Sequence, residues 1–285
     1  MKSFQKDAMR RISWRLGRKV YAKARGEPLS AQISSNGEAS LQQRVLAAIP
    51  PSTPMQVLDV GANRGEWTLS LLRQASPARL ADGGIQVDAF EPVPMTADRF
   101  ERELRTAPEG ARVRLHRYGL SDTPGCADMA LTSITGGTNT LHFDPRAGQP
   151  SEGWCKVRLE TLTRFCEETG IKHVHFVKCD AEGHDMKVIA GARPLLEAGR
   201  IDVLQFEYNH RWVHGRAFLK DAFDLISGLP YRLAKVRSHG RIDIYESWHP
   251  ELERYFEANY LLVREPALSW FDGYCGSFDE SNSYA

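Results

Sequence analysis

From residue 55 onward, short apolar runs alternate with segments whose apolar residues recur at helical spacing. This alternation is typical of a parallel β-sheet whose strands are joined by crossover helices. The predicted strands are 55–60, 85–90, 112–118, 174–179, 202–208, 231–236 and 259–264. The predicted helices lie near 65–75, 94–106, 160–169, 184–197 and 216–228. The pattern therefore predicts an α/β fold with a seven-stranded, mostly parallel sheet and helices on both faces.

One segment, 126–159, interrupts this alternation. It holds a possible extra strand at 127–131 and then a turn-rich stretch at 135–140. An insertion at this point lies among the loops at the carboxyl ends of the strands, where open α/β sheets bind ligands. We therefore expect it to border the functional site.

The first 27 residues have a different character. Nine Lys or Arg residues fall between Lys2 and Arg25, against the single acid Asp7. Five apolar residues can share one helical face: Phe4, Met9, Ile12, Leu16 and Val20. Such a helix could lie on an anionic membrane, or pack on its own domain or a second subunit. We favour packing, because the apolar side chains are of moderate bulk and Trp14 lies off the stripe.

The chain is expected to divide into three parts. Residues 1–50 form the basic helical extension with a linker near 28–40 and a short helix at 41–49, and residues 51–265 form the α/β domain. Residues 266–285 form an aromatic tail, for which a frayed end, a subunit contact and a flap over the site all remain open.

Composition narrows the class of protein. A length of 285 residues with 42% hydrophobic residues fits one large domain. The net charge of +1 gives no reason to expect nucleic acid as a partner. The five cysteines form no C-x-x-C pair, which argues against a zinc site or disulfide framework and predicts a reducing, cytoplasmic location. We see no signal peptide and no apolar run near the ~20 residues that span a bilayer.

The most informative segment is VLDVGANRG at 57–65. An apolar strand runs into Asp59, a turn between Gly61 and Gly65, and a helix; the next strand ends in Glu91. This arrangement is typical of a nucleotide-binding half, in which the carboxylate meets ribose hydroxyls. The glycine spacing is not the G-x-G-x-x-G of dinucleotide sites, and acids flank the turn. It therefore favours a ligand with an adenosine and a cationic centre, such as S-adenosylmethionine.

Two further clusters follow predicted strands. Asp180, Glu182 and His184 come after the strand at 174–179, and Glu207 lies near the end of the next. In a parallel sheet, Asp180 and Glu207 would face the same crevice. Glu182 could instead favour a helix N-terminus, and Glu207 could form a structural salt bridge.

The order of motifs resembles the FkbM family of S-adenosylmethionine-dependent methyltransferases over about residues 55–265. The matching pieces are DVGANRG at 59–65, FEPVP at 90–94, GLSD at 119–122, LETLTRF at 159–165, KCDAEGHDMKVIAGA at 178–192 and FEYN at 206–209. Ala181, Glu160 and Thr163 depart from the usual family pattern. The resemblance implies a Rossmann-like, class I methyltransferase fold and O-methylation of a sugar or natural-product hydroxyl.

It also implies roles for individual residues. The turn under the methionine part of the cofactor would be shaped by Asp59, Gly61, Asn63 and Gly65. Trp67 and Thr68 would meet the cofactor carboxylate, and Glu91 would hold the ribose diol. Ser121 and Asp122 would lie against adenine, and Asp180 near the cofactor amino group or the acceptor.

The catalytic chemistry leaves alternatives open. The candidates for the catalytic base are Asp180, Glu182, His184 and His210. Glu207 is a further candidate catalytic carboxylate. Alternatively, Asp180 and Glu207, with Asn209 or His210, could bind Mg²⁺, which would acidify an acceptor hydroxyl.

Partners and rival functions complete the expectations. We expect a small-molecule or glycan acceptor, with a homodimer possible and membrane contact through residues 1–27 not favoured. A lipid-linked glycan at a membrane would be the acceptor in the metal-assisted version. The rivals are a nicotinamide-dependent dehydrogenase and a non-catalytic module docked to a membrane or glycan-assembly complex.

Overall fold

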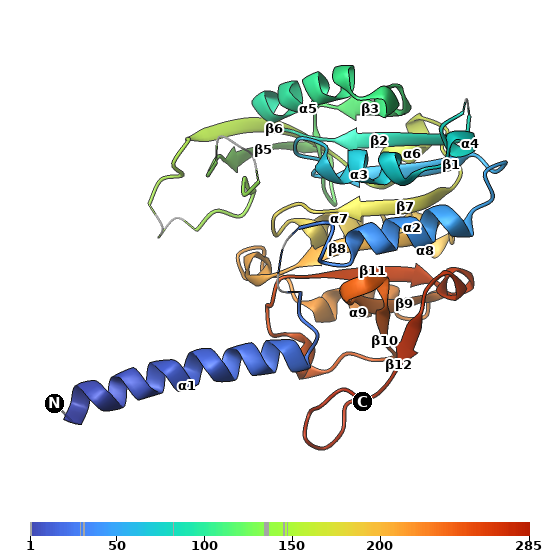
Figure 1. Ribbon diagram of the computed structural model, residues 1–285. Coiled ribbons are helices and arrows are strands. Elements are labelled where there is room, and N and C mark those ends of the chain that lie inside the picture. The colour runs from blue at the N-terminus through green and yellow to red at the C-terminus, as the bar shows by residue number, and fades with distance from the viewer. Residues whose placement is uncertain are drawn as a thin grey trace.

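The computed structural model describes residues 2–28, 30, 32–81, 83–133, 137–144, 146 and 148–285. Its centre is a sheet with the strand order β12-β10-β9-β11-β8-β7-β1-β2-β3 (Figure 1). The seven predicted strands are present as β1 (Met55–Val60), β2 (Ile85–Phe90), β3 (Val113–His116), β7 (Val174–Cys179), β8 (Ile201–Tyr208), β9 (Tyr231–Val236) and β11 (Ala258–Arg264). The strand prediction is therefore confirmed.

The sheet is mostly parallel. β1 pairs in parallel with β2 and β7, β7 with β8, and β2 with β3, while β11 runs antiparallel to β8 and β9. Two strands that the sequence pattern did not predict, β10 (Ile242–Tyr245) and β12 (Gly273–Cys275), extend the β9 edge. Both are too short to give a clear apolar run.

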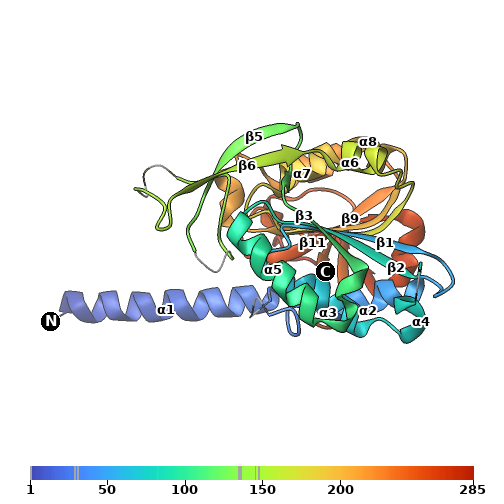
Figure 2. The same ribbon diagram turned by 90° about the horizontal axis from the view of Figure 1, so that it is seen from above.

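Helices cover both faces of the sheet (Figure 2). One face packs against α2 (Glu38–Ala48), α3 (Glu66–Gln74) and α5 (Pro94–Thr106). The other packs against α6 (Leu162–Glu168), α7 (Asp185–Gly191), α8 (Arg193–Glu197) and α9 (Leu219–Ile226). The short α4 (Pro77–Leu80) lies between α3 and β2. The single helix predicted at 184–197 is divided near Pro194, which lacks the backbone N–H that a continuous helix needs.

A second, three-stranded sheet forms from the segment that interrupted the pattern. Its order is β4 (Gly119–Leu120), β6 (Trp154–Glu160) and β5 (Gly125–Ala130). The predicted extra strand is thus present, and β6 takes the start of the helix predicted at 160–169. Residues 134–136 of the turn-rich stretch lie outside the described residues. This sheet projects beyond the carboxyl ends of β1, β2 and β7 (Figure 1).

The helix α1 (Lys2–Ala24) projects on the same side (Figures 1 and 2). Its apolar side chains Met9, Ile12, Leu16 and Val20 are 60–68% exposed, and Trp14 is 75% exposed. The prediction that this apolar stripe packs on its own domain is therefore wrong. The last turns of the helix contact the domain, where the Tyr21 ring and the Arg18 guanidinium lie against Phe256. No helix among the described residues combines the length and apolarity needed to cross a membrane.

Both ends of the chain contribute to the domain. Leu41 and Val45 of α2 are fully buried against the sheet. In the aromatic tail, the Tyr284 hydroxyl donates a hydrogen bond to the Ile244 carbonyl (2.6 Å), and Phe278 stacks on His249 with ring centres 4.1 Å apart. The tail therefore folds along the β10 edge of the sheet rather than over the site described below.

Candidate active site

The glycine turn after β1 brings backbone close to the end of β7. Gly61, Asn63 and Gly65 have φ values of 76°, 50° and 83°, a region that favours glycine. A Cβ on Gly61 would lie 1.9 Å from the Asp180 carbonyl oxygen. Only glycine fits there, and the turn leaves Gly61 and Asn63 bordering an open cavity.

Glu91 is held in a fixed orientation at the end of β2. One carboxylate oxygen accepts a hydrogen bond from the Asn63 backbone N–H (3.0 Å) and the other accepts one from the Val93 N–H (2.8 Å). Each oxygen keeps a further lone pair, as a diol-binding carboxylate requires. Burial raises the pKa of Glu91 to about 7, and these two backbone donors oppose the rise.

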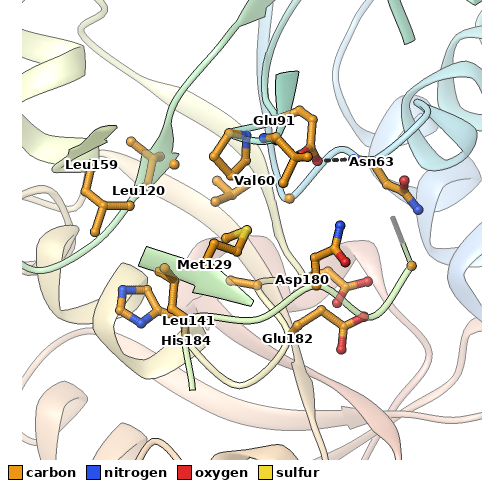
Figure 3. Close-up of a pocket in the computed structure, with 17 residues that line it drawn as sticks. Val60, Asn63, Glu91, Leu120, Met129, Leu141, Leu159, Asp180, Glu182 and His184 are labelled. Carbon is orange, nitrogen blue, oxygen red and sulfur yellow. Dashed lines mark hydrogen bonds between the residues drawn. The ribbon is translucent and has the colours of Figure 1, made fainter. Parts of the chain in front are cut away.

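Glu91 faces a cavity at the carboxyl ends of the strands (Figure 3). Polar groups gather at one end, where Asp180 and Glu182 lie beside each other. The other walls are apolar, and they are formed by Val60, Pro92, Val93, Leu120, Met129, Leu141 and Leu159. An apolar slot with a polar end fits an adenosine whose charged tail points toward the carboxylates.

The apolar end of the cavity also contacts a histidine network. His184 lines the wall, with its two ring nitrogens 2.9 Å from the Ser121 hydroxyl and 2.9 Å from the His142 ring. Burial, then His142, lowers the pKa of His184 to about 4, so the ring is neutral and positioned rather than basic. Ser121 and Asp122 do not line the cavity: Ser121 lies behind His184, and Asp122 pairs with Lys187 (2.7 Å). Ser121 and Asp122 therefore do not contact a ligand in this cavity directly, and Ser121 could act on adenine only by orienting His184.

Four predicted cofactor residues lie behind the cavity wall. Asp59 is fully buried and accepts a hydrogen bond from the Thr68 hydroxyl (2.5 Å). The Trp67 ring packs in the core, 5.1 Å from the Phe176 ring, and Gly65 lies against Phe100. The structure thus contradicts direct contact of Trp67 and Thr68 with a cofactor carboxylate, because this turn of α3 faces the sheet.

A second cavity opens next to the first and shares Gly137, Asp180 and Glu182 with it. It also reaches Glu38, Glu207 and Glu257, so it is rich in carboxylates. Two adjacent cavities that share Asp180 and Glu182 suit an enzyme that must bring two reactants together.

The three central carboxylates have different partners. Asp180 pairs with Lys178 (2.9 Å), Glu182 with Arg211 (2.8 Å), and Glu207 accepts from the Asn209 amide (2.5 Å). Burial, then the nearby Asp180, raises the pKa of Glu182 to about 8. The same two causes, in the same order, raise the pKa of Glu207 well above its usual value. Glu182 has a φ of 52°, and such backbone strain recurs at functional sites.

The predicted magnesium ligands Asp180 and Glu207 each have another partner, Lys178 and Asn209 respectively. Among the described residues, His173, His175 and Asp202 form a group whose possible metal-ligand atoms all lie within 4.8 Å of one another. This group lies at the amino ends of β7 and β8, away from the cavities at the carboxyl ends. There Asp202 already pairs with Arg264 (2.6 Å). The Asn209 amide oxygen, a proposed ligand atom, accepts the Arg211 backbone N–H (2.8 Å). His210 is exposed and lines neither cavity.

Several residues of the site escaped the sequence analysis. Lys178 is 6% exposed and directs Asp180, and Arg211 directs Glu182. Lys178 could have been found, because a lysine within an otherwise apolar strand needs a buried acid as partner. Met129, Asn139 and Leu141 carry no such signal, since their position depends on how the inserted segment folds.

The strand order and the oriented carboxylate after β2 define the class of protein, a Rossmann-like enzyme of the class I methyltransferase type. Comparison with known proteins gives the family. The family model described as the methyltransferase FkbM domain matches residues 59–240. The chain belongs to this family and is a methyltransferase, which uses S-adenosylmethionine; the dehydrogenase and non-catalytic alternatives are set aside.

A curated relative is the 2-O-methyltransferase NoeI of Sinorhizobium fredii (strain NBRC 101917 / NGR234). It is 23% identical over 198 residues, which cover 65% of this chain and 76% of the relative. A methyltransferase FkbM from Methylobacillus flagellatus KT has a TM-score of 0.45 at 15% identity, covering 73% of this chain and 43% of that one. Cofactor-bound Rv0187 from MTB has a TM-score of 0.45 at 13% identity, with coverage of 88% and 89%.

The raised pKa of Glu91 predicts a pH-dependent affinity for the cofactor. Ribose hydroxyls donate to the ionised carboxylate, so binding should be strongest above pH 7 and weaken as Glu91 takes up a proton below it. For one group with a pKa of about 7, affinity at pH 6 should be about tenfold lower than the plateau at high pH. Calorimetry with S-adenosylhomocysteine at pH 6 and 8 measures this. The Glu91→Gln variant should lose the dependence, and an equal slope in both proteins would assign it to another group.

Proposed function

We propose that this methyltransferase methylates a hydroxyl of a saccharide, with Glu182 as the base that takes the hydroxyl proton. The observation that carries the proposal is the wall shared by the two cavities, where Asp180 and Glu182 face both. The adenosine of the cofactor would occupy the first cavity and the acceptor the second.

The residues fit the cofactor. Glu91 offers two oriented oxygens, and buried side-chain oxygens of Asn63 and Asp180 lack a hydrogen-bond partner among the residues that the structure describes. These oxygens would accept from the ribose and from the amino group of the cofactor. When bound, S-adenosylmethionine supplies an electrophilic methyl group on a sulfonium, whose carbon–sulfur bond breaks as the carbon–oxygen bond forms.

The protein's tasks are to align the acceptor and to remove its proton. A base works best when its pKa lies near the working pH, and Glu182, with a pKa near 8, meets this condition among the four candidate bases. His184 is neutral and engaged by Ser121 and His142, and His210 lies outside the cavities. Asp180, paired with Lys178, is assigned to the cofactor amino group.

A saccharide acceptor suits the second cavity. Its lining is dominated by carboxylate, amide and hydroxyl groups, which are acceptors for sugar hydroxyls. The name of the curated relative, a 2-O-methyltransferase, supports transfer to oxygen. A natural-product hydroxyl presented on a sugar remains within the same proposal.

The proposal is tested by methyl transfer from labelled S-adenosylmethionine to an array of saccharides, followed by NMR of the product. We expect a methyl ether at a sugar hydroxyl. Methylation at nitrogen, or transfer to non-saccharide acceptors alone, would contradict the proposal while leaving the family assignment in place.

The same assay tests the metal alternative. Because Asp180 and Glu207 are engaged by Lys178 and Asn209, we expect turnover in EDTA within about twofold of that in added Mg²⁺. Loss of turnover in EDTA with recovery on Mg²⁺ would instead mean that these pairs open to form a metal site when substrates bind.

A further inference from the structure

A groove runs between α1 and the residues that precede β11. Its walls include Trp14, Arg15, Arg18 and Lys19 of α1 on one side, and Phe256 and Glu257 on the other. It shares Pro28, Ser30 and Glu257 with the carboxylate-rich cavity. The groove therefore adjoins that cavity, which in turn borders the cofactor cavity at Asp180 and Glu182.

The groove is cationic where the neighbouring cavity is anionic. Arg18 lies over the Phe256 ring, with the guanidinium carbon 5.7 Å from the ring centre. Within the part of the chain that the structure describes, Arg15 and Lys19 have no ion-pair partner. The acid Glu27, which also borders the groove, is neutralised by Arg25 (2.9 Å) and Lys235 (2.5 Å). Among the described lining residues, three cations, Arg15, Arg18 and Lys19, thus outnumber the one exposed acid of the groove, Glu257.

We propose that this groove binds a phosphate group of the acceptor, so that the acceptor is a phosphorylated saccharide. This inference rests on the proposed function and names its substrate class. Arginine forks match the oxygens of a phosphate, and the exposed ring of Trp14 offers a face against which a sugar can lie.

The opposite charges of the two compartments set the direction in which the acceptor binds. A phosphate is repelled by the carboxylates around Glu182 and attracted by Arg15, Arg18 and Lys19. The uncharged end of the saccharide therefore enters the carboxylate-rich cavity and presents its hydroxyl to Glu182. The helix α1 projects on the same side as the second sheet (Figures 1 and 2), and its Trp14 side chain is 75% exposed.

The test compares two matched double variants of the protein saturated with S-adenosylhomocysteine. Arg15→Glu with Lys19→Glu changes the groove, whereas Arg11→Glu with Lys23→Glu makes the same change in net charge at exposed α1 positions outside it. The probes are maltotriose 1-phosphate and maltotriose, with affinities measured by calorimetry. Wild type and the control should bind the phosphorylated probe at least about tenfold more tightly than the neutral one. The groove variant should lose this preference.

Three results would overturn the proposal. The first is equal affinity of wild type for both probes, and the second is an equal loss of preference in both double variants. The third is the absence of any probe preference together with binding to phosphatidylglycerol vesicles that both double variants weaken equally. The last would assign α1 to a membrane surface. Affinity for S-adenosylhomocysteine should be unchanged throughout, so a failed groove is distinguishable from a failed cofactor site.

Discussion

Replacing Glu91 by alanine should weaken S-adenosylhomocysteine binding by about 10- to 150-fold. A hydrogen bond to a charged group contributes about 1.5–3 kcal/mol, and both oxygens of Glu91 are oriented by backbone N–H groups toward the cavity. The measurement is calorimetry above pH 7, where Glu91 is ionised.

A neighbouring carboxylate supplies the matched control. Glu66 opens α3 close to the same turn, pairs with Arg64 (2.8 Å) and does not line the cavity. Glu66→Ala should therefore leave affinity within about threefold of wild type, a difference of less than ~0.7 kcal/mol. Unchanged affinity in Glu91→Ala would remove Glu91 from the cofactor site.

Replacing Glu182 by glutamine should lower the rate of methyl transfer by about 10²- to 10⁴-fold, the range for loss of a general base. Affinity for S-adenosylhomocysteine should change little, because the ribose is held at Glu91. In wild type, the single-turnover rate should rise with pH and level off above about 8, since a base must be ionised and burial raises the pKa of Glu182. The variant should lose this rise.

Glu103→Gln is the control for Glu182. Glu103 is exposed on α5 and lines neither cavity nor the groove beside α1, so its replacement should leave transfer within about threefold of wild type. If Glu182→Gln retained full activity while Asp180→Asn lost it, the base would be Asp180 and the Lys178 pair would have to open during turnover.

The sequence predicted best what depends on local patterning. β1, β2 and β7 are buried on both faces, so each appears as a mostly apolar run. The ends of β2 and β7 located Glu91 and Asp180 beside the cavity, whereas Asp59 lies within β1 behind the cavity wall. β10 and β12 escaped because four and three residues are too few to show a pattern.

The wrong predictions concern side chains whose position depends on how the helices and sheets pack together. The rotation of α3 against the sheet, which turns Trp67 into the core, cannot be read from a motif. The stripe on α1 predicted burial, but the helix leaves the domain before that stripe meets a partner. Met129 and Leu141 reach the cavity only because the second sheet folds over the strand ends, and no local signal records that.

A crystal structure with S-adenosylhomocysteine would show whether the cofactor lies between Glu91 and the acceptor cavity at Glu182. We expect both ribose hydroxyls on the Glu91 carboxylate and the sulfur facing the wall shared by Asp180 and Glu182. A ribose bound elsewhere, or a sulfur directed away from the second cavity, would contradict this expectation.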